Sequence, residues 1–588
     1  MTSNWFFSAF LVFLLSALFL WALGAAVFGG LHGISNLFRL PWLGYGVLLG
    51  SLQIAHLFFP IDHQFSIAFL MITAGSTTAV LCIRAVWRSE TPREAQSGWL
   101  KLLPLVLLAF CIFVPVFNAC TKPACHYDLG LYYLQEIRWI ETFPIVRGVG
   151  NLILNLGFNQ SAFLVTSFLD GLLPDRIGLW LVGGLLPWLG LTLSAYAAVR
   201  LMAARKVRRS PLEVAYAVSL PAWIYTLLGN NISSGSPDVT SSCLLIHLFL
   251  AFAAFVMTRD NSERARCLGD LWILSAICVC LKLNTLGMVV GICFMAVLFL
   301  IFERDFSPAG RAYLRWSGTV AACLLAIWVY RGVLLSGYPL FPSGIAAVPV
   351  AWQIPPSEVE QCREDTVYWA RIPYGDRKVA LEGLSWVGPW IRRVVSQDIQ
   401  FDWPLGIGLI SSAAVLLLSW MEKRLRRARY FLLFLCVPLL VHTTFWILTA
   451  PEPRYFGSTP WLFAAAPILS FIAAEESLAF LCLVANLYLC AVPMAGLLVN
   501  ASWQWAKPDP RFPEIPRSNM AERTNPAGLR YYAPIEGNQS FDNALPCANR
   551  SVQNIGLLNP AAGIAGGFQP VGEKENVSSV KGWIQREP

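Results

Sequence analysis

Charged side chains are scarce in this chain: Asp, Glu, Lys and Arg make up only 13% of its 588 residues. Soluble domains carry about 25% charged residues, so the composition excludes an ordinary soluble protein. The sequence also lacks a glycine-rich phosphate-binding loop, an HExxH pair and a CxxC pair, so it gives no support to soluble nucleotide or zinc chemistry. No internal repeat is evident, and residues 1–30 lack the basic start and cleavage site of a secretory signal.

Hydrophobic residues, in contrast, make up 56% of the chain, and the mean hydropathy is +0.56. Apolar runs of about 18 residues recur, and each is long enough to cross the hydrocarbon of a bilayer. The chain is therefore predicted to be an all-α polytopic membrane protein with about fourteen transmembrane helices. The predicted spans are 5–28, 41–60, 66–87, 102–118, 176–202, 213–229, 239–258, 269–286, 287–303, 316–335, 404–421, 430–449, 459–474 and 478–499.

The net charge of +8 is carried mostly by short loops between the spans, as expected of loops that stay in the cytoplasm. This distribution argues against nucleic acid as a partner. The basic clusters are Arg84, Arg88, Arg93 and Lys101; Arg200, Arg205, Lys206, Arg208 and Arg209; Arg259, Arg264 and Arg266; Arg304, Arg311 and Arg315; and Lys423, Arg424, Arg426, Arg427 and Arg429.

With these clusters inside, the chain divides into six predicted regions. They are N-terminal spans (1–118), a first large outer loop with surface helices (119–175), central spans (176–335), an outer loop (336–403), C-terminal spans (404–500) and an outer tail (501–588). The tail is rich in Pro, Asn and Gly, so we expect it to be partly disordered, above all beyond Asn559.

The first outer loop contains a polar, aromatic-rich stretch with Asp128 where the chain leaves the bilayer. Beyond it, Tyr133, Ile137 and Ile140 can share one side of a helix lying on the membrane surface. A carboxylate beside hydrocarbon is costly unless it is solvated or paired, so Asp128 is a candidate site residue. A helix N-cap explains Asp128 equally well at this stage.

Four more charged residues are predicted near the same membrane face: Asp238 in SSGSPD, Lys282, Arg331, and Arg454 in PEPRYFGS. The planar fork of arginine suits phosphate oxygens, and lysine can hold a phosphate as a point charge. Each has an ordinary alternative: a helix start for Asp238, snorkelling for Lys282, and structural ion pairs for the arginines.

Histidine and cysteine give weaker indications. His63 and His126 lie near the outer surface, but two isolated imidazoles are a poor metal site, and an exposed loop is the favoured interpretation of His126. The outer segments also hold four of the fifteen cysteines, and an oxidising compartment permits two bridges, Cys120–Cys125 and Cys362–Cys547.

Several stretches together resemble the GT-C superfamily of multispanning glycosyltransferases. Within it they are similar to a group of bacterial membrane proteins encoded with surface-polysaccharide genes. The matching stretches are YDLGLYYLQEIRWIETFPIVRGVGNLILNLGFNQS (127–161), SSGSPD (233–238), LKLN (281–284), SGYPLFPS (336–343), YWARIP (368–373), APEPRYFG (450–457) and GNQSFDNALPC (537–547). This chain departs from the group in having Tyr133 where histidine is usual and Ser540 where cysteine is usual.

The resemblance implies transfer of a sugar from a polyprenyl-phosphate carrier to a glycan or lipid acceptor, at the outer face of a bacterial inner membrane. It implies Asp128 as the base, with Glu136 or Asp238 as a second carboxylate. The predicted substrate-binding residues are Lys282, Arg331, Arg454, Tyr133 and Tyr338. Some relatives use a divalent metal, although no ligand cluster in this sequence demands one.

Two other functions stay open at this point. A flippase for lipid-linked sugars is one, although transporters of this kind tend to show inverted repeats and broken helices at the bilayer midplane. An O-antigen-type polymerase or ligase is the other, because these enzymes also act on lipid-linked sugars at the outer face.

Overall fold

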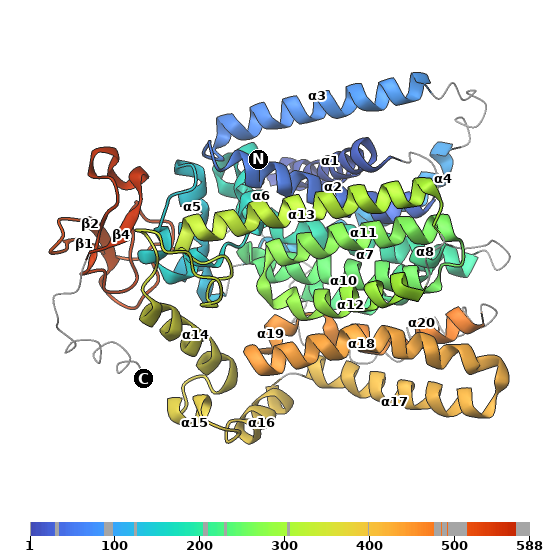
Figure 1. Ribbon diagram of the computed structural model, residues 1–588. Helices are drawn as coiled ribbons and strands as arrows, with labels where there is room; N and C mark the ends of the chain where they lie inside the picture. The colour runs from blue at the N-terminus through green and yellow to red at the C-terminus, as the bar shows by residue number, and fades with distance from the viewer. Residues whose placement is uncertain are drawn as a thin grey trace.

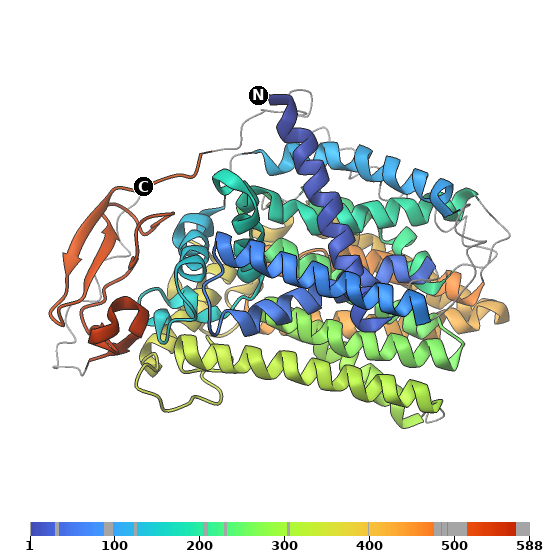
Figure 2. The same ribbon diagram turned by 90° about the horizontal axis from the view of Figure 1, so that it is seen from above.

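The computed structural model describes residues 2–29, 34–87, 98–122, 126–203, 210–228, 232–302, 306–397, 399–475, 484, 491 and 514–571. Within them the chain forms a bundle of long helices with a small β-containing unit at one end (Figure 1). Most of the long helices run roughly along the length of the bundle, whereas α1 crosses it obliquely (Figure 2).

Long helices make up most of the bundle. They are α1 (Thr2–Phe28), α2 (Ile34–Ala55), α3 (His63–Trp87), α4 (Gly98–Cys120), α7 (Ile177–Ala203), α10 (Pro237–Met257), α11 (Asn261–Leu281), α12 (Leu286–Phe302), α13 (Pro308–Ser336), α17 (Ile399–Met421) and α18 (Arg426–Thr449). The shorter ones are α5 (Leu134–Thr142), α6 (Ala162–Leu172), α8 (Pro211–Val218), α9 (Leu220–Leu228), α14 (Pro356–Arg371), α15 (Arg377–Leu381), α16 (Val387–Gln397), α19 (Pro453–Phe456) and α20 (Thr459–Ala474).

Among the described residues, nine helices are long and apolar enough to cross a membrane. This agrees with the predicted helical membrane protein. Every predicted span up to 459–474 falls on a helix or a pair of helices, and the last one, 478–499, lies outside the described residues apart from positions 484 and 491. The region 161–173 forms the short helix α6.

One predicted span, 213–229, is broken into α8 and α9 at Ser219. The Ser219 hydroxyl donates a hydrogen bond to the Tyr216 carbonyl (2.9 Å) and accepts one from the Trp223 indole (3.1 Å). Pro221 has no amide hydrogen to continue the helical pattern. Hydropathy does not reveal such a break, because both halves are apolar.

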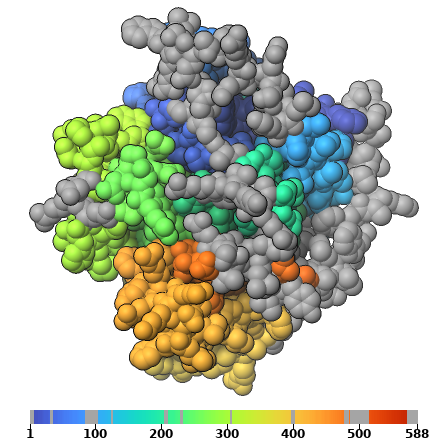
Figure 3. Space-filling model, turned by 90° about the vertical axis from the view of Figure 1, so that its right-hand side faces the viewer, coloured from blue at the N-terminus to red at the C-terminus, as the bar shows by residue number. Residues whose placement is uncertain are grey.

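The bundle has two chemically different ends. The long hairpins α10–α11 and α17–α18 turn at Thr258–Asp260 and Glu422–Leu425, and with the start of α13 they place the described basic clusters at one end, here called the basic end. Figure 3 faces the bundle from this side. The cluster between α3 and α4 and residues 204–209 lie outside the described side chains. The opposite end carries α5, α19 and the tail, and is here called the site end (Figure 1).

The tail is more ordered than its composition predicts. Strands β1 (Met520–Thr524) and β2 (Arg530–Pro534) pair antiparallel, as do β3 (Ile555–Leu557) and β4 (Phe568–Pro570). The expected disorder beyond Asn559 is therefore wrong as far as residue 571; residues 501–513 and 572–588 lie outside the described part. The reason is packing: Phe568 is fully buried and meets Trp139 of α5 edge to face at 5.8 Å.

Helices α1 and α2 cross at two glycines. A Cβ atom on Gly24 would lie 2.1 Å from the Leu40 carbonyl oxygen, and one on Gly44 would lie 1.7 Å from the Leu20 carbonyl oxygen. Helices in membranes commonly pack through small residues that let their backbones approach closely. Lipid is as apolar as the side chains, so the hydrophobic effect does not drive the helices together. This crossing therefore requires glycine on both helices.

We expect Gly44→Ala to lower the free energy of unfolding by about 1–3 kcal/mol, because the added methyl group pushes the two backbones apart. Thermal unfolding of the detergent-solubilised protein measures this. The matched control is Gly75→Ala on α3, where an added Cβ meets nothing within 4 Å. Equal melting temperatures for the two variants would show that the crossing is not tight.

Candidate active site

A π-helical turn, η2 (Leu129–Tyr133), leads from Asp128 into α5. In it the Leu134 amide donates to the Leu129 carbonyl, a wider pitch than an α-helix allows. Such turns are rare and are often found at functional sites. Asp128 stands at the start of this turn, but its side chain makes no capping hydrogen bond, so the helix N-cap interpretation is wrong.

The Asp128 carboxylate instead pairs with Arg454 of α19. The distance from Arg454 Nη1 to Asp128 Oδ2 is 3.0 Å. The side chain of Asp128 is 17% exposed and that of Arg454 is 32% exposed, so the pair is reachable from outside the protein. The short helix that carries Arg454 ends at Gly457, which takes a positive φ of 54° and packs so closely on α10 that an added Cβ would lie 2.3 Å from the Ser242 hydroxyl.

His126 is part of the same cluster. Its side chain is only 8% exposed, its Nε2 atom is in contact with Arg454 Nη1, and its Nδ1 atom lies 3.8 Å from Asp128 Oδ2. Burial lowers the pKa of His126 below its ordinary value, although Asp128 opposes the shift. The guanidinium can only donate, so Nε2 faces a donor, and on the other side of the ring the Asp128 backbone amide lies 3.2 Å from Nδ1. The interpretation of His126 as an exposed loop residue is therefore wrong.

A second ion pair lies beside the first. Lys282, which follows α11, donates to Asp238 Oδ1 in the first turn of α10. Asp238 is 5% exposed and Lys282 is 13% exposed. Ser236 caps α10 by accepting from the Asp238 amide at 3.2 Å, and its hydroxyl lies 3.3 Å from the Tyr133 hydroxyl. Asp238 therefore lies at a helix start, as the alternative interpretation predicts, and also belongs to the cluster of charged residues.

Tyr455 connects the two cations. The Lys282 ammonium lies 4.6 Å from the centre of its ring, and the Arg454 guanidinium lies 4.9 Å from it and donates to the Tyr455 hydroxyl at 3.0 Å. Tyr133 closes the other side by stacking on the His126 ring at 5.5 Å. The cluster therefore holds two carboxylates, two cations and one neutral imidazole.

Two predicted site residues lie in a different cluster. Arg331 of α13 donates to His56 Nδ1 at 3.0 Å, and His56 Nε2 lies 3.2 Å from the Phe143 carbonyl oxygen. Burial raises the pKa of Glu136 well above its ordinary value, and the positive charge of Arg331 offsets only part of this. The assignments of Glu136 as second carboxylate and of Arg331 to phosphate are therefore not supported by their contacts, which tie α5, α2 and α13 together.

The helix α5 itself differs from its prediction. Gln135 and Glu136 are buried along with Ile137 and Ile140, so α5 is enclosed rather than lying on a membrane surface. The tail covers it: the Gln135 amide donates to the carbonyl oxygens of Phe541 (2.8 Å) and Asn543 (3.1 Å).

The remaining predicted residues are accounted for as follows. The Tyr338 hydroxyl donates to the Ile354 carbonyl at 3.0 Å in a separate packed cluster, so it supports the fold of the segment between α13 and α14. Cys362 and Cys547 are both free thiols, so the second predicted bridge is absent. Cys120 is likewise a buried free thiol, so the first predicted bridge, to Cys125, is also wrong; Cys125 itself lies outside the described residues. Among the described residues no group of three or more His, Cys, Asp or Glu could hold a metal ion.

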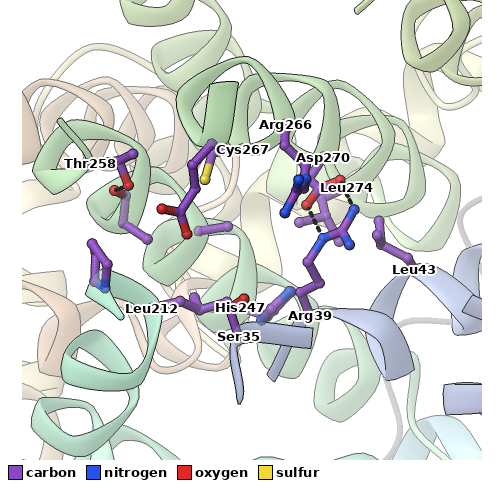
Figure 4. Close-up of a pocket in the computed structure, with 14 residues that line it drawn as sticks. Ser35, Arg39, Leu43, Leu212, His247, Thr258, Arg266, Cys267, Asp270 and Leu274 are labelled. Carbon is purple, nitrogen blue, oxygen red and sulfur yellow. Dashed lines mark hydrogen bonds and ion pairs between the residues drawn. The ribbon is translucent and has the colours of Figure 1, made fainter. Parts of the chain in front are cut away.

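One cavity lies at the basic end, where it is lined by residues of α2, α8, α10 and α11 (Figure 4). Arg39 and Asp270 face each other there, with 2.6 Å between Nε and Oδ2, and the Tyr313 hydroxyl donates to Asp270 at 2.6 Å. The cavity of about 40 Å³ has room for one or two waters and is too small for a sugar. Arg39 and Asp270 neutralise each other, so we interpret them as a structural ion pair.

His126, Ser236 and Tyr455 are the cluster members that sequence reasoning did not assign. Tyr455 lies directly after Arg454 within PEPRYFGS, and Ser236 lies within SSGSPD, so both stand in stretches that were already noted. Their roles depend on which way the side chains point, which residue types alone do not show.

A family model described as "Domain of unknown function (DUF8201)" matches residues 4–460 of this chain. The chain belongs to this family. No curated protein and no solved structure matches it. The matched range includes the whole ion-pair cluster and ends before the tail.

We expect Lys282→Met to lower the free energy of unfolding by about 3–5 kcal/mol, because Asp238 then stays buried without its ion-pair partner. Adding Asp238→Asn to the same chain should restore most of this loss. Denaturation of the solubilised protein measures both.

The control is Arg363→Gln, which breaks a pair with Glu360 whose side chains are 54% and 55% exposed. Surface pairs of this kind contribute less than about 1 kcal/mol. A Lys282→Met protein as stable as the wild type would show that Asp238 is not held as a buried carboxylate.

Proposed function

We propose that this protein is an integral-membrane glycosyltransferase of GT-C type. It moves a sugar from a polyprenyl-phosphate-linked donor to a glycan or lipid-linked acceptor. The observation that carries the proposal is the pairing of partly exposed Asp128 with Arg454, directly beside the Asp238–Lys282 pair, at one end of a bundle of apolar helices. A base and two phosphate-binding cations would thus meet at a partly exposed place at the end of the bundle.

The donor phosphate would bind the two cations. Arg454 presents a planar guanidinium whose fork fits phosphate oxygens, and the Lys282 ammonium adds a second positive charge across the Tyr455 ring. Binding of a phosphate to Arg454 competes with Asp128 for the guanidinium. The donor would therefore release the carboxylate for its part in the reaction.

The released Asp128 carboxylate accepts the proton of the acceptor hydroxyl as its oxygen attacks the anomeric carbon. The new glycosidic bond forms while the bond from the anomeric carbon to the phosphate oxygen breaks, and the bonding electron pair stays with the lipid phosphate. A single displacement inverts the anomeric centre. Arg454 and Lys282 stabilise the charge that grows on the leaving phosphate.

The distribution of charge supports a location in a bacterial inner membrane with the site facing the periplasm. The described basic clusters lie at the end opposite Asp128, and cationic loops are retained in the cytoplasm.

A polymerase or ligase acting on lipid-linked glycans is the second candidate, and the contact between His126 and Arg454 favours it. In such an enzyme the arginine and the histidine would carry the reaction and Asp128 would only hold them in place. The two candidates differ in whether the carboxylate itself is indispensable.

We expect Asp128→Asn to lower the turnover of sugar transfer by about 100-fold or more, which is the contribution typical of a general base. The assay uses purified protein in liposomes with polyprenyl-phosphate sugars and follows transfer to added acceptors. Asp175→Asn is the matched control, because Asp175 is exposed at the site end and its positive φ of 56° suits asparagine equally well.

Near-normal transfer by a folded Asp128→Asn protein, together with loss of transfer in Arg454→Gln, would favour the polymerase or ligase. Movement of the lipid-linked sugar across the liposome membrane without any transfer product would favour a flippase instead.

A further inference from the structure

The segment 538–543 of the tail forms hydrogen bonds directly with the turn that carries Asp128. The amides of Ser540 (2.8 Å) and Phe541 (2.9 Å) both donate to the same carbonyl oxygen, that of Gly130. At the front of the turn, the Gln539 side chain donates to the Tyr127 carbonyl at 2.8 Å, and the Tyr127 hydroxyl donates to the Asn538 side chain. Residues on both sides of Asp128 are therefore held by a segment more than 400 residues away in the chain.

The fit between the segment and the turn also explains a glycine. A Cβ atom on Gly130 would lie 2.6–2.9 Å from three carbons of the Phe541 ring. A side chain at position 130 would thus displace the ring, and only glycine allows it to rest on the turn. Two residues before that glycine stands Asp128, the proposed base.

The far side of the segment is anchored on α5. Gln135 donates to two carbonyl oxygens of the segment, as described above, and Arg138 pairs with Asp542 at 2.9 Å between Nη1 and Oδ1. These contacts keep the segment from moving independently of the helix that continues the turn.

We propose that segment 538–543 is a positioning element for the candidate active site: it holds the π-helical turn so that Asp128 faces Arg454. The inference rests on the proposed function for its catalytic meaning. The segment lies beyond residues 4–460, so the family domain alone would not contain a complete site.

The reason is mechanical. Asp128 makes no capping hydrogen bond to its own turn, and the turn has the rare π-helical hydrogen-bond pattern in place of a regular α-helix. The tail supplies hydrogen-bond donors from outside the turn, the amides of Ser540 and Phe541, and the Phe541 ring packs against the turn. A displacement of a catalytic group by about 1 Å can cost as much as 100-fold in rate.

The test compares three variants of the full chain: Phe541→Ala, Gly130→Ala and the double variant. Phe541→Ala should lower kcat about tenfold or more with little change in KM, and should speed amide hydrogen exchange in residues 127–134 about tenfold. Gly130→Ala should do the same, because its methyl group expels the ring. In the double variant the two effects should not add, because the ring that the methyl would strike is already gone.

The matched control is Arg550→Gln. Arg550 ties the tail to Glu358 of α14 and to the Asn151 carbonyl, but does not contact the turn. It should leave both kcat and exchange in residues 127–134 unchanged. Conservative Phe541→Leu should recover most of what Phe541→Ala loses.

Unchanged exchange in residues 127–134 of a folded Phe541→Ala protein would overturn the proposal, and so would faster exchange with an unchanged kcat. A wild-type protein that transfers no sugar would contradict the proposed function instead. In that case the exchange measurement still decides whether the segment holds the turn.

Discussion

Charges near the hydrocarbon of a membrane must be paired or solvated, and the site end of this protein is built around that constraint. Two ion pairs, Asp238–Lys282 and Asp128–Arg454, bring together the starts or ends of α10, α11, η2 and α19. Tyr455 lies against both cations and so joins the pairs into one cluster. The same contacts that hold these helices together therefore also assemble the candidate active site.

The scarcity of charge made part of this site predictable. Because a charged residue at the edge of a span is expensive, each one stands out in an apolar sequence, and Asp128, Asp238, Lys282 and Arg454 do lie together. The energetic cost of a charge does not indicate which charged residues form a pair with one another. Arg331 contacts His56 in a second cluster instead.

Helix positions followed from hydropathy for the same physical reason, whereas local breaks and long-range contacts did not. The interruption at Ser219 depends on one hydroxyl and a following proline within an apolar stretch. The order of the tail depends on residues such as Phe541 and Phe568 finding partners on η2 and α5. Composition describes the tail in isolation and so predicts disorder, but its stability comes from the surface that it covers.

The account as a whole depends on the two cations at the site end receiving the lipid phosphate of a donor. A cryo-electron microscopy structure of the full chain in nanodiscs with a polyprenyl phosphate tests this most directly. The account predicts phosphate density within about 3 Å of the Arg454 guanidinium and the Lys282 ammonium, with Asp128 released from the arginine. Phosphate density at the basic end, beside Arg39 and Asp270, with the site end unchanged, would contradict it.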